Sequence, residues 1–157
     1  MKKLYRRNVG IIVSKGSKVL LCARADKKDD CWQFPQGGIE KDESIVNAAK
    51  RELWEETGIK SIRLVEEMPF SVIYDFPKEY KTPYLEKYAG QEQFWVLFEF
   101  LGDDEEIHFD INPNCIEFKK YKWDNIVVAP EEIINFKKDA YKKVVEYFIP
   151  FVEKLSK

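Results

Sequence analysis

Apolar and β-branched residues near the start of the chain predict a β-hairpin. Residues 8–14 and 18–23 are both rich in such residues, and Lys15, Gly16 and Ser17 between the two runs are typical of a tight turn. A short aromatic strand is expected within residues 31–39, where a proline and paired glycines permit unusual backbone angles. The chain therefore begins with strands that lead into a glycine-rich loop.

A helix is predicted after this loop, over residues 43–57. Its apolar positions recur at helical spacing, at Ile45, Val46, Ala49 and Leu53. Polar residues 42–44 can cap its first turn, and Gly58 provides a typical C-terminal stop. The hydrophobic pattern thus places one amphipathic helix between strands.

The remaining pattern predicts more strands and two helices near the C-terminus. Strands are expected at residues 62–68, 70–76, 93–101 and 116–123, with the polar stretch 77–91 as a long connection. Helices are expected at residues 130–136 and 138–155, the second with an apolar stripe that is broken at Pro150. This order of elements predicts an α/β fold in which a mixed sheet lies between helices.

Length and composition fit a single domain that spans residues 1–157. Of the 157 residues, 45% are hydrophobic, which is enough to build one core. Lys and Arg number 26 against 28 Asp and Glu, for a formal charge of -2. The chain therefore lacks the basic surplus of a general nucleic-acid coat protein, and any RNA contact must be local.

Cysteine and histidine usage argues against several kinds of site. The three cysteines form no CxxC pair, so neither a disulfide framework nor a structural zinc site is expected, and a cytoplasmic setting is favoured. His108 is the only histidine and is assigned to an alternating strand, with a structural role. The apolar run at residues 9–13 is too short for a signal peptide or a membrane span. Neither a membrane nor an obligate protein partner is indicated.

Acidic residues cluster on the predicted central helix, within a longer pattern that begins in the glycine loop. Residues 37–59 read GGIEKDESIVNAAKRELWEETGI. The fixed positions of this pattern are Gly37, Glu43, Arg51, Glu52, Leu53, Glu55, Glu56, Gly58 and Ile59. A chance match in a chain of this length is on the order of one in a million or rarer. The spacing is therefore a strong indication of function.

The glutamates of this helix indicate a divalent metal site. At about 100° per residue, Glu55 and Glu56 fall on either side of Glu52 on one helix face. Like charges so close cost stability unless cations neutralise them, and clustered carboxylate oxygens are preferred ligands of Mg²⁺ and Mn²⁺. A bound ion would offset charge on a phosphate and help to activate water. Without the surrounding pattern, the same charges would be interpreted as a solvated helix face.

Two further parts of the pattern have expected supporting roles. Arg51 is expected to pair with Glu43 and to hold the loop against the helix. Gly37 and Gly38 are expected to let the backbone come close to phosphate and metal. Both roles are hypotheses about how the loop and the helix form one site.

The pattern at residues 37–59 resembles the signature of the Nudix hydrolases at every fixed position. Beyond it, nearly the whole chain resembles the bacterial RNA pyrophosphohydrolases and the related dinucleoside polyphosphate hydrolases of that superfamily. The segments that carry this resemblance are YRRNVG at 5–10, WQFPQGG at 32–38, GQEQFW at 90–95, EF at 117–118 and FKKDAY at 136–141. WQFPQGG is the most specific of them to this branch.

The resemblance implies an α/β/α sandwich and Mg²⁺-dependent cleavage of phosphoanhydride bonds. Glu52, Glu55 and Glu56 would bind the metal, and Glu117 matches a glutamate outside the signature that completes the site. One of these glutamates would act as general base, and the sequence leaves open which.

The resemblance also implies contacts with the substrate. Arg6 and Lys137 match residues that contact phosphates, and Phe136 matches a residue that helps to hold a base. Without the resemblance, Arg6 and Lys137 would be interpreted as solvated surface charges, and Phe136 as a core residue.

Two departures from the family pattern limit what can be carried over. Arg7 stands where the family usually has proline, and the loop at residues 26–30 is longer and more acidic than usual. Phosphate contacts of arginines near Arg24 are therefore not transferred. Trp32 is expected to pack rather than to stack on a base.

The function implied is removal of pyrophosphate, or of successive phosphates, from the 5′-triphosphate or diphosphate end of RNA. The reaction would leave a 5′-monophosphate and initiate RNA decay. One alternative is hydrolysis of nucleoside polyphosphates of the diadenosine tetraphosphate type. Another is a non-catalytic nucleotide-binding module, but such modules typically lose the carboxylates that are all present here.

Overall fold

Two long parallel strands form the centre of the structure. The computed structural model describes residues 3–79 and 87–155. Strand β1 (Tyr5–Lys15) runs parallel to β7 (Gly90–Phe100), paired from Tyr5 with Gly90 to Ser14 with Glu99. Residues 8–14 of β1 are all buried, which is typical of a strand that is covered on both faces.

The other strands extend this pair on both sides into one mixed sheet, in the order β3-β2-β1-β7-β5. Strand β4 also pairs with β1, β6 with β7, and β8 with β2. The bounds of these strands are β2 Lys18–Arg24, β3 Trp32–Gln33, β4 Gln36–Gly38, β5 Ile62–Glu67, β6 Val72–Asp75 and β8 Phe118–Asn125. The predicted hairpin and the predicted mixed sheet are both confirmed.

Strand β1 changes its antiparallel partner along its length. Next to the turn, Ser14 and Lys15 pair with β2, whereas residues 8–10 pair with β4. Strand β2 meanwhile pairs with β3 and β8. The two strands of the hairpin therefore diverge away from their turn, and the short strands of the WQFPQGG segment lie against them.

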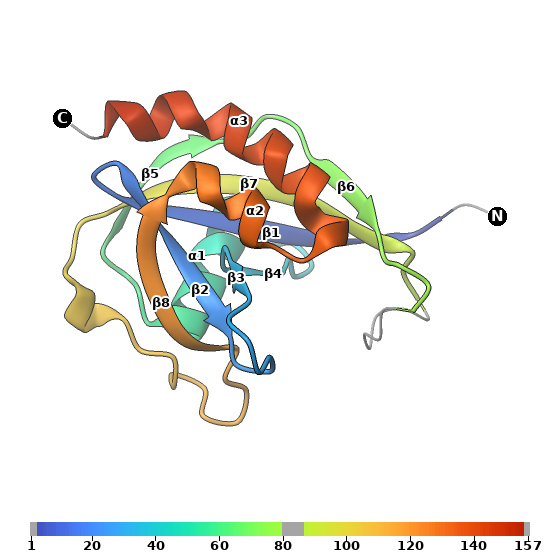
Figure 1. Cartoon of the computed structure of the whole chain (residues 1–157), viewed down its shortest axis with the longest axis horizontal. Coiled ribbons are helices and arrows are strands. Elements are labelled where there is room, and N and C mark those ends of the chain that lie inside the picture. The colour runs from blue at the N-terminus through green and yellow to red at the C-terminus, as the bar shows by residue number, and fades with distance from the viewer. Residues whose placement is uncertain (1–2, 80–86, 156–157) are drawn as a thin grey trace.

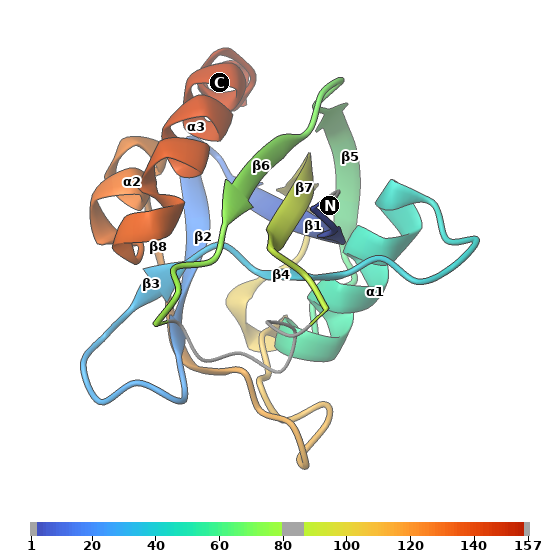
Figure 2. The ribbon, with the colours of Figure 1, turned by 90° about the vertical axis from the view of Figure 1, so that its right-hand side faces the viewer.

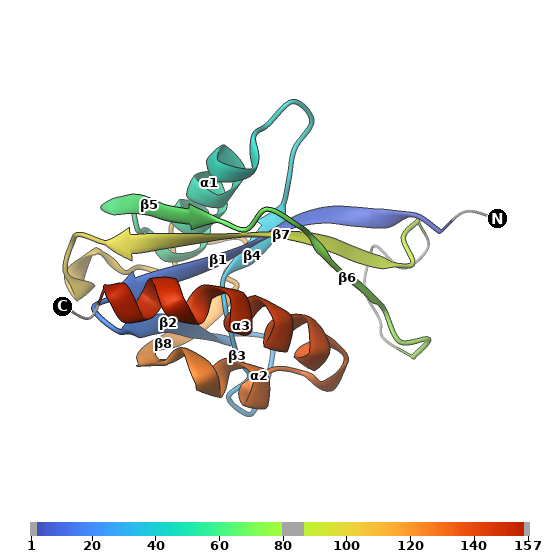
Figure 3. The ribbon, with the colours of Figure 1, turned by 90° about the horizontal axis from the view of Figure 1, so that it is seen from above.

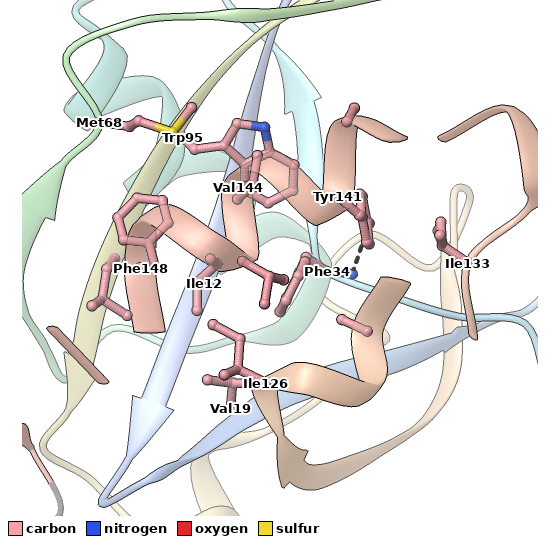
Figure 4. Packing of buried hydrophobic residues seen from close by; sticks show 14 of the residues in the cluster. Ile12, Val19, Phe34, Met68, Trp95, Ile126, Ile133, Tyr141, Val144 and Phe148 are labelled. Carbon is pink, nitrogen blue, oxygen red and sulfur yellow. Dashed lines mark hydrogen bonds between the residues drawn. The ribbon is translucent and has the colours of Figure 1, made fainter. Parts of the chain in front are cut away.

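Helices cover both faces of the sheet. Helix α1 (Ile45–Thr57) lies on one side, and α2 (Ala129–Glu132) with α3 (Lys138–Lys154) on the other (Figure 1, Figure 2 and Figure 3). The sheet thus separates two apolar cores. Helix α3 buries an aromatic stripe against β1 and β7, where the Tyr141 hydroxyl accepts a 3.2 Å hydrogen bond from the Phe34 N–H (Figure 4). This is the expected α/β/α architecture.

Helix α1 begins and ends at the capping residues that the sequence predicts. The Ser44 hydroxyl accepts a hydrogen bond from the Asn47 N–H, and Gly58 adopts φ 76° while its N–H donates to the Trp54 carbonyl. The helix starts two residues later than residue 43, because Ser44 itself has extended angles. Between these caps, α1 places the Glu52 carboxylate against Gly37 of β4.

The predicted helix at residues 130–136 is wrong as a continuous element. Helix α2 ends at Glu132, Ile133 and Ile134 are extended, and a 3₁₀ turn covers Asn135–Lys137. Ile133 is buried in the core beside α3 (Figure 4), and its extended backbone allows that burial. Packing of one apolar side chain thus outweighs local helix propensity.

The helix predicted at residues 138–155 is confirmed to within one residue, and its apolar stripe continues past Pro150 rather than breaking there. Helix α3 continues through Pro150 to Lys154, and Val152 remains buried. Pro150 and Glu146, whose carbonyl loses its donor, are both exposed, so water can replace the missing hydrogen bond.

The middle of the chain differs from the expected pattern in two places. His108 follows the 3₁₀ turn Asp104–Glu106 rather than lying in a strand, and its N–H donates to the Thr57 carbonyl at 2.8 Å. The expected connection at residues 77–91 ends earlier, because β7 begins at Gly90; residues 80–86 lie outside the described part. Among the described residues, none of the helices is long and apolar enough to cross a membrane.

Candidate active site

A cavity of about 440 Å³ opens beside β4, between α1 and the loop before α3. Most of the residues that the sequence singles out line it, namely Arg6, Gly37, Gly38, Glu52, Glu56, Glu117 and Lys137. Its volume is within the range of about 300–1,000 Å³ that is usual for small-molecule sites. The fold therefore joins segments that are far apart in the sequence into one polar pocket.

Arg51 connects helix α1 to the loop that precedes it. Its guanidinium donates to both carboxylate oxygens of Glu43, at 2.8 and 2.9 Å, and to the Gly38 carbonyl at 2.9 Å. This hydrogen bonding lowers the pKa of Glu43. The predicted pairing of Arg51 with Glu43 is present, and its bidentate geometry fixes the glycine loop against α1.

The same guanidinium also meets two glutamates of the helix. Arg51 Nη1 lies 2.8 Å from Glu52 Oε1 and 3.4 Å from Glu55 Oε2. Burial raises the pKa of Glu52, and the hydrogen bond from Arg51 opposes that rise. The Glu55 side chain is 46% exposed and does not line the cavity, although its charge still raises the pKa of Glu52 and of Glu56.

Glu56 carries the most unusual carboxylate of the site. Its Oε2 is buried and has no hydrogen-bond partner among the described residues. Burial raises the pKa of Glu56 well above its ordinary value, the charges of Glu52 and Glu117 raise it further, and the Gln36 N–H acts in the opposite direction. A buried oxygen without a partner, close to two other carboxylates, is a position where a cation would be strongly stabilising.

The donor set fits a hard divalent cation by its chemistry. It consists of carboxylate oxygens, which such ions prefer. In the described part of the chain, no three acidic, His or Cys side chains already converge on one point at metal-binding distance. Glu52 is instead engaged by Arg51, so the carboxylates must turn toward one another to share an ion.

Two glycines make room for charged side chains rather than only for ligand. A Cβ atom on Gly37 would lie 2.0 Å from Cδ of Glu52, and one on Gly38 would lie 2.3 Å from Nη2 of Arg6. Glu52 and Arg6 therefore cross directly over the backbone of β4. Any larger residue at either position would displace a charged group of the pocket.

Glu117 reaches the pocket from the segment that leads into β8. Its carbonyl accepts a 2.9 Å hydrogen bond from the Ala25 N–H, and its Oε1 accepts one from the Cys115 thiol at 3.4 Å. The pairing of β8 with β2 thus brings Glu117 into the cavity that Glu56 lines, where its charge raises the pKa of Glu56.

Lys137 is not a solvated surface charge, as its sequence context alone would suggest. Only 4% of its surface is exposed, and burial with the nearby charge of Arg24 lowers its pKa to about 8. Its Nζ lies 5.9 Å from the ring centroids of Tyr74 and Phe136. A buried cation at the pocket wall is well suited to bind an anion.

Phe136 lies next to the pocket rather than on its surface. Its ring is partly buried against the core, 5.7 Å from that of Tyr74, and Tyr74 and Phe76 line the cavity instead. The Tyr74 hydroxyl donates a 2.8 Å hydrogen bond to Gln91 Oε1, and this bond holds the Tyr74 ring in place. Phe136 therefore supports the aromatic wall from behind.

Several pocket residues were not singled out by the sequence. Arg24 lines the cavity and donates to both oxygens of Asp26, at 2.9 and 2.7 Å. The Gln93 amide donates to Asn8 and to Gln36, at 2.9 and 2.8 Å, and ties β4 to the central strands. Gln36 and Gln93 belong to the WQFPQGG and GQEQFW segments, which carry the resemblance but show no spacing from which a role follows, and Arg24 lies outside the resembling segments.

Comparison with known proteins supports a common origin over most of the chain. Residues 4–148 match the family described as NUDIX domain. An RNA pyrophosphohydrolase of Bartonella henselae is 41% identical over 155 residues, which cover 92% of this chain and 90% of that protein. One from Pelagibacter ubique is 41% identical over 143 residues, which cover 90% of this chain and 89% of that protein. Nudix hydrolase 27, chloroplastic, of Arabidopsis thaliana is 38% identical over a region that covers 94% of this chain and 67% of that protein.

Solved structures with lower identity share the fold. A dihydroneopterin triphosphate pyrophosphohydrolase of E. coli has a TM-score of 0.73 and 20% identity, with 95% of this chain and 99% of that chain covered. An Ap4A hydrolase of C. elegans has a TM-score of 0.59 and 15% identity, with 92% and 99% covered. At these identities the likeness concerns the arrangement of the sheet and helices.

Proposed function

The chain belongs to the Nudix family and is a Nudix pyrophosphohydrolase, and we propose that it acts on the phosphorylated 5′ end of RNA. It removes pyrophosphate, or successive phosphates, from a 5′-triphosphate or diphosphate and leaves a 5′-monophosphate that opens the RNA to decay. Relatives named RNA pyrophosphohydrolase that are 41% identical support this substrate. A cytoplasmic location belongs to the proposal and agrees with three free cysteines.

One observation carries the chemical part of the proposal. The buried Glu56 carboxylate lies near the charges of Glu52 and Glu117, while Arg6 and Lys137 line the same cavity. An acidic wall that attracts a cation and basic residues that attract phosphates are the two requirements for phosphoanhydride hydrolysis. The pocket therefore contains the acidic groups that would bind the cation and the basic groups that would bind the phosphates.

Divalent metal is the cofactor class of this family, and we assign Mg²⁺, with Mn²⁺ as a substitute. Glu52, Glu56 and Glu117 would hold it, with Glu55 joining from the exposed side of α1. When bound, the ion supplies positive charge to the phosphates and favours deprotonation of water. Carboxylate ligands support a hard divalent ion of this kind.

The residues of the chain then have distinct tasks. Arg51 and Glu43 keep the glycine loop in place, so that Glu52 and Arg6 stay at its surface. Arg6 and Lys137 neutralise phosphate oxygens, and the wall of Tyr74 backed by Phe136 packs against the first base. One glutamate accepts the proton that the attacking water releases.

The overall reaction adds one water molecule across one phosphoanhydride bond. The water oxygen bonds to one phosphorus, the bridging oxygen leaves with the other fragment, and the released proton passes to a carboxylate and then to solvent. This balance holds whether pyrophosphate or a single phosphate departs, and no covalent intermediate with the protein is required.

Dinucleoside polyphosphates are the second candidate substrate. A further cavity adjoins the first at Arg6 and Glu52, and it offers space for groups beyond the phosphates. Turnover of triphosphorylated RNA and of diadenosine tetraphosphate should be compared at equal enzyme and Mg²⁺ concentrations. Faster formation of monophosphorylated RNA supports the proposal, whereas efficient cleavage of the dinucleotide alone overturns it.

A further inference from the structure

A second cavity continues the site on the other side of Arg6 and Glu52. It has a volume of about 540 Å³, and Arg6, Gly38 and Glu52 line both cavities. The Arg6 guanidinium lies over Gly38, and the Glu52 carboxylate lies over the neighbouring Gly37. These two side chains therefore form a charged boundary where the cavities meet.

The second cavity is lined by cations that the proposed reaction does not yet use. Arg7 comes from β1 and Lys41 from the turn before α1, and both are exposed. Arg7 lies over the Phe94 ring, 5.0 Å from its centroid. Within the described part of the chain, neither Arg7 nor Lys41 forms an ion pair. Their charges are available to an anionic ligand.

The position of this cavity relative to the aromatic wall decides which anion fits. Tyr74, Phe76 and Lys137 line only the first cavity, and Glu52 lies on the border between the two. A nucleoside on the aromatic wall would place its first phosphate in the cavity that Arg6 and Lys137 line. The phosphates beyond it would continue past Glu52 toward Arg7. The body of an RNA continues from the opposite end of that first nucleotide.

We propose that the second cavity is the subsite for the phosphates beyond the cleaved bond, and that Arg7 and Lys41 bind the departing pyrophosphate. This inference rests on the proposed function, because it uses the same carboxylates as the point of cleavage. Phosphates are held by charge-assisted hydrogen bonds, which are stronger than neutral ones. The extra cations thus hold the leaving group while the first cavity holds the nucleoside.

The test compares the two products as ligands in variants of the second cavity. Arg7→Gln and Lys41→Gln each remove one charge, and Lys143→Gln, at an exposed site on α3, is the matched control. Inorganic pyrophosphate and a 5′-monophosphorylated RNA oligonucleotide are each titrated as inhibitors of the hydrolysis of triphosphorylated RNA in the presence of Mg²⁺. Pyrophosphate binding is also measured directly by calorimetry.

Each cavity variant is expected to bind pyrophosphate about tenfold more weakly, while binding of monophosphorylated RNA stays unchanged. Lys143→Gln should match the unaltered protein with both ligands. Equal loss for both products, loss for RNA alone, or no loss in either variant overturns the inference. Loss for RNA alone would assign the cavity to the RNA chain.

Calorimetry separates this inference from the proposed function. Pyrophosphate binding requires no RNA cleavage, so a protein that fails to cleave RNA can still lose pyrophosphate affinity in Arg7→Gln. That result would reject the RNA substrate and support the subsite. Normal RNA cleavage with unchanged pyrophosphate affinity would reject the subsite alone.

Discussion

Glu56 is the residue whose surroundings most clearly require a ligand. A carboxylate oxygen that is buried without a partner costs free energy, and neighbouring Glu52 and Glu117 add repulsion. In the Nudix pyrophosphohydrolase, a divalent ion would remove both costs at once. The features that weaken the metal-free fold at this point are therefore the ones that would make metal binding strong.

Glu56→Gln should lower hydrolysis by several orders of magnitude and stabilise the metal-free protein near neutral pH. The raised pKa means that stability from the protonated carboxyl is complete below about pH 4.5, the ordinary value, and is lost as pH rises through the folded-state pKa. Gln does not titrate, so the variant keeps this stability. Urea unfolding in a chelator from pH 4.5 to 8 measures the difference.

The exposed Glu146→Gln variant is the control for that experiment. Mg²⁺ should raise the melting temperature of the control but have much less effect on Glu56→Gln. If the free energy of unfolding changed with pH in the same way for Glu56→Gln and the control, the ionised Glu56 carboxylate would not destabilise the metal-free fold.

Lys137→Met should stabilise the protein at pH 7 by up to about 3 kcal/mol, while it lowers affinity for phosphorylated substrates. The folded-state pKa of about 8 lies below the ordinary 10.5, so the penalty of the charged form is complete below about pH 8 and fades toward 10.5. Unfolding free energies at pH 7 and pH 10, with Lys143→Met as control, give the result. A gain that persists at pH 10 would mean that packing rather than charge is responsible.

Gly37→Ala should reduce activity at least a hundredfold with little loss of stability. The added methyl would displace the Glu52 carboxylate, which is the flexible end of a side chain. Gly16→Ala is the contrasting variant, because Gly16 has φ 59° and no atoms near its missing side chain. It should cost about 1 kcal/mol of stability and leave kcat unchanged. Similar activities for the two variants would mean that Gly37 is not needed to hold the Glu52 carboxylate in place.

Side-chain environments were the least predictable part of the site. Residue types and spacing identify the glutamates, because three carboxylates on one helix face need a cation. The burial of Lys137 depends on how the loop before α3 folds onto the sheet, and no local pattern encodes it. Likewise, the contact of Glu52 with Gly37 exists only once β4 lies beside α1.

At the scale of elements, the site depends on how the glycine loop is attached to α1. Arg51 makes this attachment through Glu43 and the Gly38 carbonyl. The loop has little apolar surface of its own to bury, since its residues 40–42 are exposed. Its position therefore depends on these polar contacts.

Arg51→Lys should lower kcat about 10–100-fold and destabilise the fold by about 1–3 kcal/mol, because a lysine cannot make the bidentate contact. The matched control is Arg63→Lys, which alters an exposed pair with Glu99. Steady-state kinetics and thermal unfolding of both variants measure the two effects. Equal behaviour of the two variants would mean that the loop is held by other contacts.

Elements with strong local signals were predictable, and those shaped by packing were not. Helix α1 has a capping serine, a glycine stop and an apolar stripe, and it forms within two residues of the expected bounds. The segment at residues 130–136 has helix-forming residues, yet burial of Ile133 splits it. Helix α3 continues through Pro150 because that residue is exposed to solvent. Such exposure depends on tertiary packing, so the local sequence does not reveal it.

The whole molecule brings four distant segments to one pocket. Arg6 comes from β1, the glutamates from α1, Glu117 from the entry to β8 and Lys137 from the turn before α3. The pairing of β1 with β4 and of β8 with β2 makes this arrangement, and both pairings join residues that are not adjacent in sequence. The architecture was predictable from the order of elements, whereas the convergence of Glu117 and Lys137 followed only from family resemblance.

We propose that this pocket hydrolyses the phosphorylated 5′ end of RNA with a divalent ion held by its glutamates. The most direct test is to follow the 5′ end of a defined triphosphorylated RNA with Mg²⁺, with excess chelator, and with Glu117→Gln in Mg²⁺. We expect monophosphorylated RNA to form with Mg²⁺ only, and its rate of formation to fall at least a hundredfold in the variant. An RNA end that remains triphosphorylated with Mg²⁺, or is converted equally well by Glu117→Gln, would contradict this proposal.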